Sequence, residues 1–204
     1  MDLIIKKIKM KIDKISYLQC ELKNYEILSK DDILTLLQNY EKTTRDEMSS
    51  YFEKYFKDDT FADILLKIAN KYKENKRIHI YIISSLGNMV NRYNLKETKE
   101  IYEYFKKYMF EKGISAYVAI YLPHFKNFQK EENKWDYFMK IAKMTPKKIA
   151  EINFLAILNE YIEEVPDEYK QEIIDFLQEK YQMANNEGGK KYYQDMINRI
   201  NFNF

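Results

Sequence analysis

The stretch RIHIYIISSLGNMVNRYN, residues 77–94, decides the fold because it is long, almost uncharged and apolar around most of a helix. An arginine stands near each end, no charged residue lies between them, and Gly87 lies near the middle. Helical periodicity separates the stretch into two faces. The apolar face comprises His79, Ile82, Ile83, Leu86 and Val90, widened by Ile78, Ile80 and Met89, and the polar face comprises Arg77, Tyr81, Ser84, Asn88 and Arg92.

A helix that is apolar over so much of its circumference needs neighbours on several sides. Such neighbours are available to an inner helix between stacked helix pairs. Gly87 would let an adjacent helix approach closely, at a cost of about 1 kcal/mol in helix propensity relative to alanine. The stretch therefore predicts an inner helix of a stacked array.

The rest of the chain also predicts helices. Only four glycines and three prolines occur in 204 residues, and apolar residues recur mostly at three and four positions. Capping residues three positions before an acid, at Ser29, Thr44, Thr60 and Asn94, predict helix starts, with Asn75, Ser115, Thr145 and Asp167 as further starts. Stops are expected at Gly113, at Val165–Pro166 and at Gly188–Gly189. The predicted helices lie near 2–27, 30–42, 45–57, 61–74, 76–93, 95–111, 115–128, 133–144, 146–164, 167–184 and 190–201.

Alternate predicted helices begin about 31 to 38 residues apart, which is within the range of helical-repeat units. No linker rich in proline, glycine or serine interrupts them. We therefore expect one all-α domain over residues 1–204, with an N-terminal cap helix in 1–28, repeats in 29–184 and a C-terminal cap helix in 185–204.

The segment RIHIYIISSLGNM resembles the second helix of a HEAT repeat, with a leading arginine, small and aliphatic residues, and Leu-Gly before a further aliphatic residue. Two further segments resemble this helix less closely: SAYVAIYLPHF (115–125) and KIAEINFLAILNEYI (148–162). The resemblance implies a right-handed α-solenoid of about five stacked helix pairs. The first helices lack the usual proline and the turns lack a regular aspartate, so no HEAT subfamily is selected.

The composition and the N-terminal segment predict a cytoplasmic location. Cys20 is the single cysteine, which excludes an internal disulfide and fits a reducing compartment. Lysines interrupt the N-terminal segment MDLIIKKIKMKIDKI, which therefore lacks a signal-peptide core. Its isoleucines form one helical face opposite lysines, as in a membrane-surface helix. The acids Asp2, Asp13 and Glu21 argue against lipid binding, so we expect this helix to cover the open end of the array and expect no membrane partner.

No residue pattern predicts catalysis, a cofactor, a metal or a small-molecule substrate. His79 and His124 are the only histidines, and no carboxylate lies one helical turn from either, so a hydrogen-bonded interior or groove histidine is expected. Cys20 lies among aliphatic residues and is expected to pack. Phosphate-binding loops need clustered glycines in a P-loop or dinucleotide pattern, and neither pattern is present.

Tyrosine is unusually abundant, with 19 copies. A tyrosine can seal a helix junction or supply contact area at a binding face. Because solenoids present their inner helices along a concave surface, we expect the polar stripes of those helices to form an aromatic and basic groove. The predicted binding residues are Arg77, Tyr81, Asn88, Arg92, Tyr117, Tyr121 and His124.

These patterns predict a non-enzymatic module that binds another protein. The abundance of lysine, isoleucine, asparagine and tyrosine suggests an AT-rich, bacterial coding genome. By analogy, a small bacterial helical-repeat protein with an aromatic surface suggests an immunity protein that neutralises a cognate toxin by occlusion. The alternative is a HEAT-like nucleic-acid-binding or DNA-alkylation-repair-type protein, in which Trp135 and Asp136 would act. A net charge of only +2 disfavours that alternative.

Overall fold

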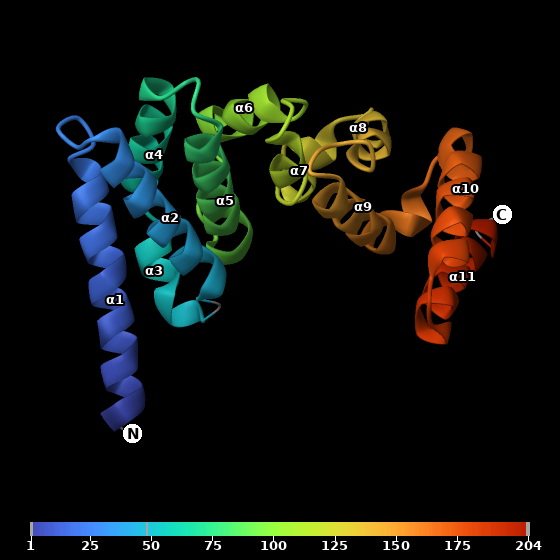
Figure 1. The fold of residues 1–204 in the computed structure, drawn as a ribbon, viewed down its shortest axis with the longest axis horizontal. Helices are drawn as coiled ribbons and strands as arrows, with labels where there is room; N and C mark the ends of the chain where they lie inside the picture. Colours follow the sequence, from blue (N-terminus) through green and yellow to red (C-terminus); the bar gives the residue numbers. More distant parts are fainter. Residues whose placement is uncertain (1, 48, 203–204) are drawn as a thin grey trace. The chain divides into compact units, whose positions relative to one another are not determined.

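The computed structural model describes residues 2–47 and 49–202, and over these residues the protein is helical with no strand (Figure 1). The chain divides into two compact units, Met1–Glu131 and Glu132–Phe204. No glycine, proline or serine marks this boundary in the residues around 131, so it was not predicted. Each unit is therefore described separately.

Among the described residues of unit 1 four helices are long, and shorter elements lie between the second and third of these and after the fourth. The predicted helix at 45–57 is replaced by a short turn and a single-turn helix, and the predicted helix at 115–128 breaks because Pro123 stands in its middle. The elements are α1 (Asp2–Lys23), α2 (Lys30–Asp46), η1 (Ser50–Phe52), α3 (Glu53–Phe56), α4 (Asp59–Lys71), α5 (Lys76–Tyr93), α6 (Lys99–Tyr108), α7 (Ser115–Val118), η2 (Leu122–His124) and η3 (Phe128–Lys130).

The stretch at 77–94 forms a helix that has neighbours on several sides, as its apolar circumference predicts. Helix α5 packs against α2, α3, α4 and α7. All residues from Ile82 to Met89 are buried, including three with polar side chains. Neighbours on several sides thus cover an apolar helix that no single partner could cover.

Helix ends show which capping signals were interpreted correctly. Ser29 caps α2 and Asn75 caps α5, as predicted, each accepting from a backbone amide three residues on. Asn94 does not start a helix; it ends α5 with a left-handed φ of 54°, and Thr98 caps α6 instead. The start predicted at Thr44 is wrong, because Thr44 lies inside α2.

Unit 2 contains two helix pairs. Its elements are α8 (Lys134–Ile141), α9 (Lys147–Tyr161), η4 (Ile162–Glu164), α10 (Asp167–Met183) and α11 (Glu187–Phe202). Helix α8 packs on α9, and α10 packs on α11. The rings of Phe154 and Phe176 meet edge to face with centroids 5.1 Å apart, which joins α9 to α10.

The paired glycines of unit 2 do not stop a helix. Gly188 and Gly189 lie in the first turn of α11, where the side chain of Asn186 accepts from the Gly189 amide at 2.7 Å. An asparagine that satisfies this amide starts the helix before the glycines. None of the described helices has both the length and the apolar character that crossing a membrane requires.

Candidate binding surface

A buried polar network lies beneath α5 and joins three parts of unit 1. The Ser84 hydroxyl lies 2.9 Å from the Glu41 carboxylate of α2 and 3.0 Å from the hydroxyl of Tyr121. Asn88 Nδ2 donates to the Ser84 carbonyl at 2.8 Å and to the Tyr121 hydroxyl at 3.2 Å. Because Glu41 accepts, Ser84 donates to it, and Tyr121 must donate to Ser84. The guanidinium of Arg45, 3.2 Å from Glu41, balances the carboxylate charge.

Gly87 allows this network to form. A Cβ atom at Gly87 would lie 2.2 Å from Cγ of the Tyr121 ring, so the ring rests on the bare backbone of α5. The close approach that the glycine predicted is present, but a ring from the turn between α7 and η2 makes it rather than an adjacent helix. Burial raises the pKa of Tyr121, and hydrogen bonding to Ser84 partly offsets that rise.

Two of the seven predicted binding residues are therefore interior residues. Asn88 is fully buried and Tyr121 is 7% exposed. Their side chains hold the 115–125 segment against α5, and neither side chain is available to a partner. Placing them on an open groove was wrong, because helical periodicity cannot distinguish a solvated polar stripe from a buried one that is hydrogen-bonded.

The other five predicted residues do not line one groove. Arg77 is exposed at the start of α5, whereas Arg92 at the other end donates to the carbonyl of Arg45 at 2.8 Å. His124 is exposed and lines a separate hollow, and Tyr81 and Tyr117 are half-buried. The predicted set is thus divided among several places on unit 1.

His79 is the hydrogen-bonded interior histidine that the sequence predicted. Its Nε2 lies 2.8 Å from the Lys73 carbonyl and its Nδ1 lies 2.9 Å from the Tyr104 hydroxyl. A carbonyl can only accept, so Nε2 carries the proton and Nδ1 accepts from Tyr104. Burial lowers the pKa of His79, which keeps the ring neutral. Among the described residues no group of three His, Cys, Asp or Glu could hold a metal.

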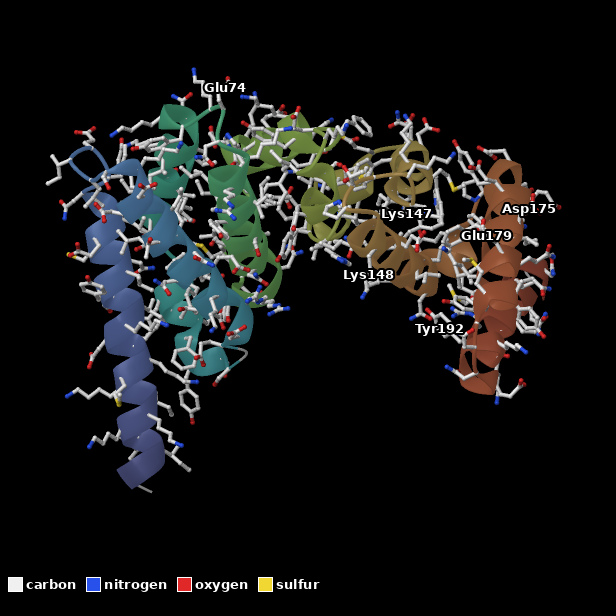
Figure 2. All side chains as sticks on the ribbon, in the orientation of Figure 1. Glu74, Lys147, Lys148, Asp175, Glu179 and Tyr192 are labelled. Carbon is white, nitrogen blue, oxygen red and sulfur yellow. The ribbon has the colours of Figure 1, made fainter. Side chains whose placement is uncertain are left out.

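An open, basic hollow of about 850 Å³ surrounds the loop between α4 and α5. Glu74, labelled in Figure 2, is the one acid in a lining that holds four lysines and an arginine. Two of the lysines are already engaged: Lys71 donates to the carbonyls of Tyr25 and Glu26, and Lys76 pairs with Glu111 at 3.0 Å. The lining is Lys30, Asn70, Lys71, Tyr72, Lys73, Glu74, Asn75, Lys76 and Arg77.

The first turns of α1 are the most unusual surface of unit 1. Ile15, Leu18 and Leu22 are buried, but toward the N-terminus the same helix loses its cover. Figure 1 shows that this end of α1 extends past α2 and α3. Ile4 and Ile5 are 67% and 57% exposed. The sequence signal was the alternation of isoleucines with lysines, which we assigned to an end cap.

Two further expectations concern single residues. Cys20 is exposed, so the prediction that it packs was wrong. Trp135, which a DNA-repair function would need at its surface, is buried, with its ring 5.2 Å from that of Phe138. Asp136 accepts a hydrogen bond from the Tyr169 hydroxyl. Neither residue of this pair supports the nucleic-acid alternative.

Comparison with protein-family models, with curated proteins and with solved structures finds no match for the chain.

Proposed function

We propose that the protein is a non-enzymatic module that binds another protein, and that the uncovered end of α1 is its main contact. The main supporting observation is that large apolar side chains are exposed at one end of a helix whose other end packs on unit 1. Ile4, Ile5 and Met10 are each more than half exposed. Burying an aliphatic side chain of this size contributes about 1.5–3 kcal/mol, so Ile4 and Ile5, which are adjacent in the chain, can anchor a partner. Met10 lies on another side of the helix.

The anchored helix lowers the cost of binding. The second half of α1 packs on α2, α3 and α4, which fixes the direction of its first turns. Lys11 also pairs with Glu47 at 2.6 Å. A partner would therefore meet a helix that is already formed, and less ordering entropy opposes binding.

The charge around the apolar side chains indicates an acidic partner. Lys6, Lys7, Lys9 and Lys14 are exposed on the same turns, against the single acid Asp13 within residues 4–14. Positive residues at the rim of an apolar contact steer a negatively charged surface toward it and disfavour basic competitors.

Two finer parts of the proposal rest on the sequence resemblance and on analogy. The helix pairs stack as a right-handed, HEAT-like α-solenoid, for which the many-sided packing of α5 is the supporting feature. The protein acts as an immunity protein, covering the active region of a cognate toxin.

The experiment places a photoreactive amino acid at Ile5 and, as a control, at Ile152, which is equally exposed at 57% on α9 of unit 2. Irradiation in the native host is expected to cross-link an acidic protein from position 5 and not from position 152. With that protein purified, Ile4→Ser/Ile5→Ser should weaken binding at least tenfold, whereas Ile152→Ser/Met183→Ser should leave the Kd unchanged.

The antidote role has its own test. The captured protein, expressed alone, should arrest growth, and co-expression of this chain should relieve the arrest. No cross-link at position 5, together with steeply salt-dependent binding to duplex DNA, would contradict the protein-binding proposal.

A further inference from the structure

A second hollow lies in unit 1 where α5 ends and the η2–η3 segment passes beside it. Its volume is about 480 Å³. Asn94 ends α5 in the left-handed conformation, which turns the chain so that the next residues form one wall. The lining consists of Val90, Asn91, Asn94, Leu95, Lys96, Glu97, His124, Lys126, Asn127 and Lys130.

The three lysines of this hollow outnumber its one acid. Lys96, Lys126 and Lys130 are exposed, and within residues 2–47 and 49–202 none of their ammonium groups has a hydrogen bond or an ion pair. Three like charges on one small opening repel each other, and this repulsion is relieved when an anion enters.

The one acid of the lining is held by the backbone. Glu97 Oε2 accepts from the Lys126 amide at 2.7 Å, and Oε1 accepts from the Asn127 amide at 3.1 Å. Both carboxylate oxygens are thus occupied by amides rather than by the lysines. Glu97 fixes the wall that carries Lys126 and leaves the lysines available.

We propose that this hollow, hereafter the lysine hollow (Lys96, Lys126 and Lys130 with Glu97 as its brace), binds carboxylates from an acidic segment of the protein partner. This inference rests on the proposed function and names the chemistry of a second contact. Each ammonium group offers three donors, so two or three adjacent carboxylates can be bound without moving the backbone.

The basic hollow between α4 and α5 is a weaker candidate for the same role. Two of its lysines already donate to carbonyl oxygens, since Lys71 binds Tyr25 and Glu26 and Lys76 binds Lys112. It also has no braced wall comparable to the one at Glu97. The lysine hollow combines a smaller volume with a wall that Glu97 holds in place.

The test uses the isotope-labelled full chain and hexaglutamate as the probe, at low salt. Amide signals of residues 96 and 126–130 are expected to shift and saturate. Lys126→Ala/Lys130→Ala should weaken hexaglutamate binding at least tenfold. Lys147→Ala/Lys148→Ala removes the same charge from α9 of unit 2, where Figure 2 labels both lysines, and should change the affinity less than twofold.

Three results would overturn the inference: shifts centred elsewhere, an equal loss in the two double variants, or saturable binding of inorganic pyrophosphate without binding of hexaglutamate. This inference and the proposed function can fail independently of each other. A partner captured through Ile5 while hexaglutamate leaves the lysine hollow unchanged overturns this inference alone. Binding of hexaglutamate at the hollow by a chain that captures no protein overturns the proposed function alone.

Discussion

Two isoleucine-rich helical segments of unit 1 have opposite environments. In α5, Ile78, Ile82 and Ile83 are completely buried, whereas in α1 Ile4 and Ile5 are mostly exposed. Both segments alternate isoleucine with polar residues, and the polar partners differ: serine, asparagine and tyrosine in α5, lysine in α1. The comparison indicates that the interior accepts polar groups that can be hydrogen-bonded, while lysine keeps a segment at the surface.

The largest expected effect lies in α5. Ile82→Ala removes a fully buried side chain and leaves a cavity, so the free energy of unfolding should fall by about 2–5 kcal/mol. Urea denaturation of the full chain measures this change. A loss below about 1 kcal/mol would show that α5 is not held as tightly as its burial implies.

The next effect concerns the contact between Gly87 and Tyr121. Gly87→Ala should destabilise the protein by about 1–2 kcal/mol, because overpacking against the ring exceeds the gain in helix propensity. In the Gly87→Ala/Tyr121→Ala double variant the clash disappears. The loss in that variant should be smaller than the sum of the two single losses, as a double-mutant cycle would show. Additive losses would mean that the ring does not rest on the glycine.

The His79 site should give a pH-dependent effect of intermediate size. Burial lowers the pKa of His79 in the folded state, so below its ordinary value of 6.5 the unfolded chain binds the proton first. The stabilisation from the neutral ring is thus complete above pH 6.5 and is lost as the pH falls below that value. Lys107 contributes to the lowering, whereas the Lys73 carbonyl, Glu74 and Glu111 oppose it.

Denaturation of the wild type and of His79→Gln across this pH range measures that contribution. The wild type should lose stability on acidification more steeply than His79→Gln does. If the free energy of unfolding of wild type and of His79→Gln fell equally with pH, burial would not lower the pKa of His79 as described.

The smallest effect is expected at the exposed end of α1. Ile4→Ser/Ile5→Ser should change the free energy of unfolding by less than about 0.5 kcal/mol, because both side chains are mostly exposed and have little buried surface to lose. Urea denaturation gives the value. A larger loss would mean that these isoleucines stabilise the folded chain itself, and the proposed contact would lose its main support.

The sequence predicted the helices well where periodicity was long. The helix predicted at 76–93 has the same bounds as α5, and Ser29 and Asn75 cap the helices they were assigned to. The predicted bounds of shorter helices were wrong where more than one residue could cap the helix. Asn94 and Thr98 both resemble caps, and only the backbone conformation shows that the first ends a helix and the second starts one.

The candidate surface was less predictable than the fold. Asn88 and Tyr121 were assigned to an open groove because their spacing matches a polar stripe, but tertiary packing buries both. The lysine hollow could not be foreseen, because Lys96 and Lys126 meet only through the turn at Asn94 and the brace at Glu97. Sequence spacing does not report such non-local juxtapositions.

The seating of the Tyr121 ring on Gly87 also constrains how the chain can diverge. A descendant that acquires any side chain at position 87 must shrink the ring at 121, and Ser84 and Asn88 then lose the hydroxyl that they share. These four positions should therefore change together or not at all across related chains, and they would form one inherited unit even where every surface residue has drifted.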